Sequence, residues 1–154
     1  MDLQNCIGLE TRHGYRTFEL YAGDLTESGA AADLLIVSAF AGGYRPVPDT
    51  LLGALHSSWG IDLASLGREL DLRGSFGFWL SSPLQAGHFK RLLCVEILGG
   101  QFSIVEALNN VFVALAIADA KGFELRTVAL PLLGAGNQAI DPDVAMSALL
   151  PAVR

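Results

Sequence analysis

DLLIVSAFAGG, residues 33–43, is the stretch that decides the fold of this 154-residue chain. The run from Asp33 to Phe40 is almost continuously apolar, which is the pattern of a strand covered on both faces. Gly42 and Gly43 then end the run, so a loop is expected at the carboxyl end of the strand. The stretch therefore predicts an α/β fold around a mostly parallel or mixed sheet.

Apolar runs on either side of this strand extend the pattern. Two short runs, 6–12 and 16–21, meet around His13 and Gly14 and predict an N-terminal β-hairpin that completes one edge of the sheet. Further strands are expected over 77–80, 92–98 and, as a central strand, 127–133. Helical or turn segments are expected over 49–56 with Asp49 as the cap, 63–70, 103–120 and from Asp141 onward. Together these elements predict a three-layer α/β/α sandwich with a mixed, mostly parallel sheet.

Composition favours a single soluble domain, residues 1–154. Hydrophobic residues make up 51% of the chain, yet no apolar run reaches the ~18 residues of a membrane span. The N-terminus has no basic and apolar signal pattern, so we expect a cytoplasmic protein in which Cys6 and Cys94 are buried thiols. The last expected helix runs to Arg154 without a capping glycine, which we interpret as a domain excised from a longer multidomain protein.

The charge distribution bears on the class of partner. The net charge is −6, the lysines are Lys90 and Lys121, and the arginines are scattered, whereas nucleic-acid binding needs a basic face. Helix N-termini and backbone amides can still bind an anionic small molecule without basic side chains. We therefore expect a small-molecule partner, and neither nucleic acid nor membrane.

Three loops stand out because each follows an apolar strand, and ligands of open α/β sheets bind at the carboxyl ends of strands. The candidate ligand-binding residues on these loops are Gly23, Asp24 and Leu25; Ser38, Ala39, Phe40, Ala41, Gly42, Gly43 and Tyr44; and Leu133, Gly134, Ala135, Gly136, Asn137 and Gln138.

The order of these loops resembles the macro-domain family of ADP-ribose-binding modules, of which the chain looks like a divergent member. The matching stretches are GDLT at 23–26, DLLIVSAFAGG at 33–43 and ALPLLGAGNQ at 129–138, within a resemblance covering about residues 17–150. The resemblance implies that Asp24 accepts a hydrogen bond from the adenine amino group and that the Leu25 amide holds the ring. It also implies that the amides of 134–137 wrap the diphosphate and that 41–44 line the distal ribose.

Each motif also has an interpretation without a ligand. Asp24 can cap the segment that follows with Thr26 completing a turn, and Gly42 with Gly43 can form an ordinary loop. The glycines at 134 and 136 can form a tight strand-to-helix turn. They also fit a Rossmann dinucleotide fingerprint, but that fingerprint normally opens the first βαβ unit, whereas several expected strands precede it here.

The family's hydrolytic members carry asparagines at the end of the second apolar strand, where this chain has Ser38, Ala39, Phe40 and Ala41. We therefore expect a reader of ADP-ribose or a related NAD-derived nucleotide more than a hydrolase, with Phe40 or Tyr44 stacking on any extra group. By family analogy, signalling nucleotides made from NAD in bacterial defence are a natural ligand class.

Two rival functions stay open. One is hydrolysis of ADP-ribosyl esters or phosphates, and the other is a ligand-free scaffold for oligomerisation. A homo-oligomer or a fused effector domain is compatible with the sensor interpretation, and no cofactor or metal is implied. Glu96, in the middle of an apolar strand, is either a candidate acid or base or the partner of an arginine such as Arg91 or Arg126.

Overall fold

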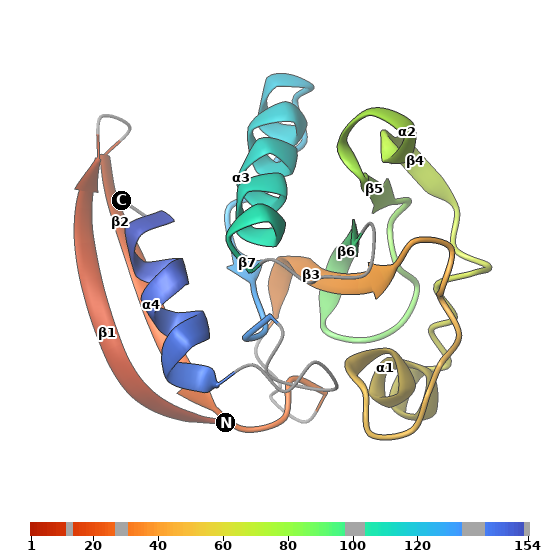
Figure 1. Ribbon diagram of the computed structural model, residues 1–154, viewed down its shortest axis with the longest axis horizontal. Coiled ribbons are helices and arrows are strands. Elements are labelled where there is room, and N and C mark those ends of the chain that lie inside the picture. Colours follow the sequence, from red (N-terminus) through yellow and green to blue (C-terminus); the bar gives the residue numbers. More distant parts are fainter. Residues whose placement is uncertain (12–13, 27–30, 98–103, 134–140, 153–154) are drawn as a thin grey trace.

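A five-stranded mixed sheet forms the centre of the chain in a computed structural model, which describes residues 1–11, 14–26, 31–97, 104–133 and 141–152 (Figure 1). In spatial order its strands are β4 (Arg68–Asp71), β5 (Phe78–Ser81), β6 (Phe89–Ile97), β3 (Ala32–Phe40) and β7 (Val128–Ala129). β3 pairs in parallel with β6 and β7, while β5 pairs antiparallel with β4 and β6. All strands except β5 therefore run in one direction, and the predicted mixed α/β sheet is confirmed.

β3 is buried on both faces, as its sequence predicts. Leu34 and Ile36 belong to one core cluster, and Leu35 and Val37 belong to a second cluster on the opposite face. This alternation is the period of two that an extended chain requires. The sheet consequently has an apolar core on each side.

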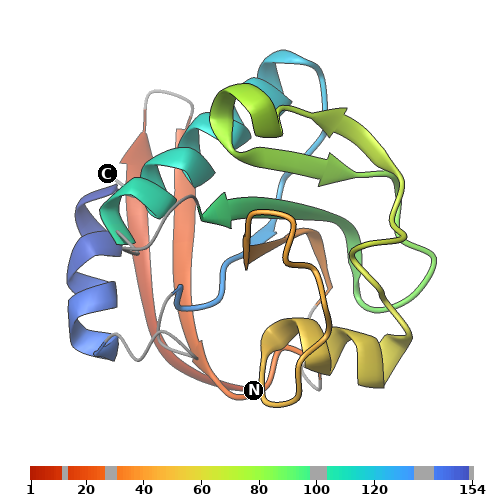
Figure 2. The ribbon, with the colours of Figure 1, turned by 45° about the vertical axis from the view of Figure 1, so that its right-hand side comes forward.

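The described part of the chain has four helices besides the sheet, and Figure 2 shows helices on both sides of the strands. They are α1 (Leu51–Trp59), α2 (Arg73–Phe76), α3 (Ile104–Ala120) and α4 (Pro142–Ala152). Residues of α3 and α4 contribute to the cluster around Leu34, and Leu55 of α1 contributes to the cluster around Leu35. α3 and α1 thus cover opposite faces of the sheet. None of the described helices is both long and apolar enough to cross a membrane.

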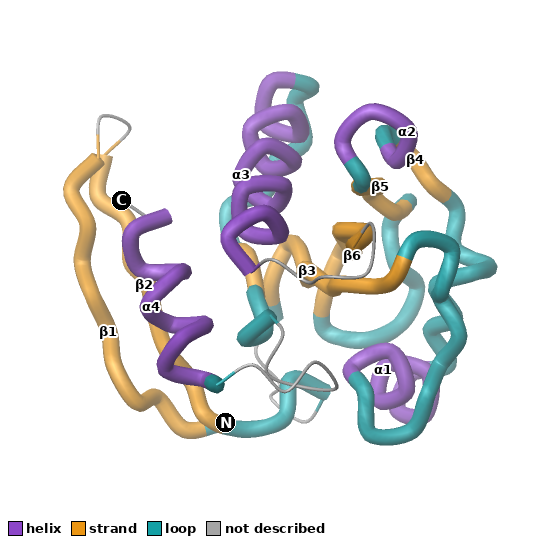
Figure 3. The backbone as a smooth tube through the Cα atoms, in the orientation of Figure 1, coloured by secondary structure: helices purple, strands orange, loops and turns teal. Residues whose placement is uncertain are grey.

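The N-terminal hairpin is present, but it forms a sheet of its own (Figures 1 and 3). β1 (Asp2–Thr11) and β2 (Gly14–Ala22) pair antiparallel with each other, and within the described strands neither pairs with the central sheet. The prediction that the hairpin completes one edge of the sheet is therefore wrong. Instead, Phe18 of β2 packs against the apolar cluster that includes Leu149 of α4.

β7 is shorter and less central than predicted. It spans only Val128–Ala129 and lies at the end of the strand order, beside β3. The sequence continues through Pro131, which has no N–H to donate to a neighbouring strand. The predicted central strand over 127–133 is therefore wrong in position and length.

The two cysteines differ in environment. Cys94 is fully buried, and this burial raises the pKa of its thiol to about 12. Cys6 lies on exposed β1, so the prediction of a buried thiol is confirmed for Cys94 and wrong for Cys6.

Candidate functional site

Two cavities share three lining residues at the start of α1, which we call the junction. The larger, about 840 Å³, lies between the loop at 23–25 and α1, and the smaller, about 280 Å³, lies at the end of β3. Asp49, Thr50 and Leu51 line both cavities. Ligand pockets commonly measure ~300–1,000 Å³, so the larger cavity has the volume of a nucleotide site and the smaller one lies just below that range.

The smaller cavity occupies the edge of the sheet where ligands of α/β folds bind. Phe40 and Ile97 are the last residues of the parallel strands β3 and β6, and residues 131–133 follow β7. The predicted residues that line this cavity are Ser38, Ala39, Phe40, Gly43 and Leu133. Ala41 and Gly42 do not line it, and the predicted loop residues 134–138 lie outside the described residues.

Asp24 organises its own turn and also lines the larger cavity, beside Gly23 and Leu25. Its Oδ1 accepts hydrogen bonds from the amide and the hydroxyl of Thr26, both at 2.8 Å. The bond from the amide, and then that from the hydroxyl, lower the pKa of the Asp24 carboxyl. The turn-capping interpretation is thus correct for this residue, and it is compatible with a binding role.

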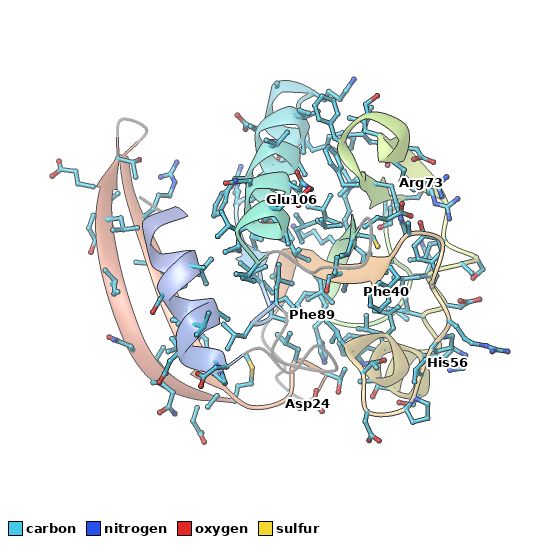
Figure 4. All side chains as sticks on the ribbon, viewed as in Figure 1. Asp24, Phe40, His56, Arg73, Phe89 and Glu106 are labelled. Atoms are coloured by element: carbon cyan, nitrogen blue, oxygen red, sulfur yellow. The ribbon has the colours of Figure 1, made fainter. Side chains whose placement is uncertain are left out.

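Phe40, which lines the smaller cavity, is followed by a tight turn. The Gly43 amide donates to the Phe40 carbonyl at 2.7 Å, and Gly42 has a φ of 70°, which favours glycine. The Ala41 amide also donates to the Ile97 carbonyl of β6. Although these hydrogen bonds hold the backbone, Phe40 is 60% exposed; Figure 4 labels it at the end of β3.

The start of α1 differs from the prediction in a way that matters for the site. Thr50, not Asp49, is the N-cap, because its hydroxyl accepts from the Gly53 amide and donates to the Val47 carbonyl. Asp49 is left before the helix with a φ of 62°, the one described non-glycine residue with positive φ. Asp49 lines both cavities.

Small residues on one side of α1 shape the larger cavity. Gly53, Ala54 and Ser57 line it at the helical spacing of three and four residues. A Cβ on Gly53 would lie 2.1 Å from the Val47 carbonyl oxygen, so glycine is required there. This helical pattern was visible in the sequence, but nothing in the sequence indicated which loop it faces.

Replacing Asp49 by glycine is expected to stabilise the fold by about 0.5 kcal/mol, raising Tm by roughly 1–2 °C. The left-handed backbone is costly for a residue with a Cβ, and glycine's larger unfolded-state entropy offsets part of the gain. Thermal unfolding followed by circular dichroism measures the change. Asp62→Gly is the control, and it should lower Tm because Asp62 caps the Ala64 amide. A lower Tm for Asp49→Gly would show that its conformation carries no strain.

Asp33 ties the strand after α3 to β3. Its Oδ2 accepts from the amides of Arg126 and Thr127 at 2.8 and 2.9 Å, and its own amide donates to the Thr127 hydroxyl. The bond from Lys90, followed by that from the Thr127 amide, holds the pKa of Asp33 well below its usual range. These hydrogen bonds hold β7 beside β3, and β7 leads into residues 131–133, which line the smaller cavity.

Tyr44 does not line either cavity, contrary to the prediction that it faces the ligand. It is buried, and its hydroxyl donates to Glu96 while accepting from the Trp79 indole at 3.2 Å. Burial, and then the bond to Glu96, raise the pKa of Tyr44. Glu96 therefore has a tyrosine partner, and the expected arginine partners are wrong, since Arg91 pairs with Glu69.

Few titratable groups among the described residues line the cavities. Asp24, Asp49 and His56 line the larger cavity, and Arg45 joins Asp49 in the smaller one. Among the described residues no cluster of His, Cys, Asp and Glu could hold a metal ion. No protein-family model and no curated protein matches the sequence.

Proposed function

We propose that the chain is a macro-like, three-layer α/β/α module that binds ADP-ribose or a related NAD-derived nucleotide across the two cavities that share the junction residues. The observation that carries the proposal is that Asp49, Thr50 and Leu51 line both a cavity of about 840 Å³ and a second one at the carboxyl ends of β3 and β6. An elongated ligand with a larger and a smaller end fits this arrangement.

The adenosine end is assigned to the larger cavity. Thr26 uses Oδ1 of Asp24, which orients the carboxylate and leaves Oδ2 to accept from the 6-amino group of adenine. A carboxylate with a lowered pKa stays an acceptor at neutral pH. The cavity therefore favours a base that presents a donor over one that presents a carbonyl oxygen.

The ribose units are assigned to the junction and the smaller cavity. Asp49 is negative, which disfavours a phosphate beside it and suits the two hydroxyls of a ribose, as acidic side chains do in dinucleotide sites. The diphosphate is assigned, on the family resemblance alone, to the loop 134–137. Pro131, Leu132 and Leu133 bring the chain to the smaller cavity just before that loop.

A binding module of this kind senses its ligand on behalf of an effector outside the described residues. The proposal makes the chain a reader, with turnover belonging elsewhere. Incubation of ADP-ribose with the chain, followed by chromatography, should return the nucleotide unchanged.

The test of the adenine assignment compares ADP-ribose with its analogue in which hypoxanthine replaces adenine. Wild-type protein should bind ADP-ribose about 10- to 100-fold more tightly, because the analogue places an oxygen against the Asp24 carboxylate. Asp24→Asn keeps an oxygen for Thr26 but turns a donor toward the base, so the preference should disappear or reverse. Isothermal titration calorimetry gives the four dissociation constants.

Asp62→Asn is the matched control, because Asp62 caps a similar turn through the Ala64 amide and lines neither cavity. It should leave the preference for adenine intact. An unchanged preference in Asp24→Asn would contradict the assignment of adenine to the larger cavity.

A further inference from the structure

We infer that the ligand carries an aromatic base at its distal end, and that this base stacks on Phe40 in the smaller cavity. The inference rests on the proposed function, and it changes the ligand class from ADP-ribose itself to a dinucleotide with a base on each ribose. Phe40 would then be the residue that determines this specificity.

The exposure of Phe40 is the first observation. Its side chain is among the most exposed of the large apolar residues described, at 60%, although neighbouring residues of β3 are buried. The hydrogen bonds from Gly43 to Phe40 and from Ala41 to Ile97 hold this backbone in place. Phe40 therefore presents an aromatic face to solvent at the wall of the cavity. Stacking of a planar group on this face would be favourable because it removes apolar surface from water.

The other walls of the cavity are the second observation. Ala39, Val47, Leu52, Ile97, Pro131, Leu132 and Leu133 all line it. The polar lining residues Ser38, Arg45, Asp49 and Thr50 can bind the hydroxyls of a ribose, whereas hydroxyls placed against these apolar walls would lack partners, which is unfavourable. A flat heterocyclic base instead fits the apolar part of this cavity, where Phe40 provides an aromatic wall.

The size and the charges of the cavity complete the argument. About 280 Å³ is slightly below the range for complete ligands, so the cavity suits one ring and not a second nucleotide. Asp49 at the junction accepts from the adjoining ribose, while Arg45 lies in the same cavity as Phe40 and can donate to a polar substituent on the ring. The base therefore enters from the junction and ends beside Phe40.

The experiment compares the affinities of ADP-ribose, NAD⁺ and NADH for the whole chain by calorimetry. At least one dinucleotide should bind about tenfold more tightly than ADP-ribose, a difference of about 1.4 kcal/mol. Phe40→Ala should remove that gain, so that the dinucleotide and ADP-ribose bind with equal affinity to this variant, whereas Phe40→Tyr should retain the gain.

Phe76→Ala is the matched control, since Phe76 is also exposed, at 46%, but lines neither cavity. It should keep the gain. Two results would overturn the inference while the proposed function stands: ADP-ribose binding with no dinucleotide tighter, or a gain that survives Phe40→Ala. Failure of all three ligands to bind would instead overturn the proposed function and the inference with it.

Discussion

Replacing Asp33 by alanine is expected to lower the free energy of unfolding by about 3 kcal/mol. Asp33 is 8% exposed, and its carboxylate accepts from the Arg126 and Thr127 amides and from the Thr127 hydroxyl. Alanine would leave these donors without their acceptor at the point where β7 meets β3. Urea denaturation at pH 7, followed by tryptophan fluorescence, measures the change.

Lys90→Ala separates the ion pair from the backbone bonds. The Lys90 side chain is 78% exposed, so removing it should cost less than about 1 kcal/mol despite the 2.6 Å contact with Asp33. If Lys90→Ala lowers the free energy of unfolding as much as Asp33→Ala does, then the ion pair, and not the hydrogen bonds to the backbone amides, stabilises the contact between β3 and residues 126–127.

The same residue predicts acid sensitivity. The folded-state pKa of Asp33 is depressed, so its contribution is fully present above the unfolded value of ~3.9 and is lost as the pH falls from there through the folded pKa. Asp33→Asn should therefore show a shallower loss of stability than wild type below about pH 4. Equal slopes for the two proteins would exclude Asp33 as a source of the acid sensitivity.

Ser57→Trp is expected to weaken ADP-ribose binding at least about 100-fold, or about 2.7 kcal/mol. Ser57 is exposed on α1 and lines the larger cavity on the same side as Gly53 and Ala54. An indole there occupies space assigned to adenosine without replacing any buried side chain. Among the described residues the Ser57 hydroxyl donates only to the Ala54 carbonyl of its own helix, so stability should change little.

The sequence predicted the elements whose signal is local. β3 is apolar on both faces, and a strand buried on both faces must be apolar throughout, so its place in the core followed directly. The positions of β7 and of the hairpin depend on pairing between distant segments. Asp33 binds Thr127, 94 residues away, and the residues around Asp33 or around Thr127 do not by themselves indicate that the two pair.

The candidate site was predictable to a similar degree. Asp24 and Phe40 were identified from their loops, and both line cavities. Asp49 was assigned as a helix cap because aspartate and threonine are both good caps and the two are adjacent. The choice of Thr50 follows from its hydroxyl also meeting the Val47 carbonyl, a contact that exists only once the loop has folded.

Tyr44 shows the opposite error. It follows a glycine-rich loop and was expected to face the ligand, yet its ring packs edge-on against Trp79 at 5.7 Å between centroids. Its hydroxyl donates a hydrogen bond to Glu96, which lies within the apolar run of β6. Two polar groups that each looked functional in the sequence satisfy one another in the interior, as buried polar groups must.

Calorimetric titration of ADP-ribose into wild type, Ser57→Trp and Ser58→Trp tests the central claim most directly. Ser58 is the neighbouring exposed serine of α1 and lines neither cavity, so it receives the same indole outside the site. We expect wild type and Ser58→Trp to bind with the same affinity and Ser57→Trp to lose binding. Absence of binding to wild type, or equal binding by all three proteins, would contradict a nucleotide site between α1 and the loop at 23–25.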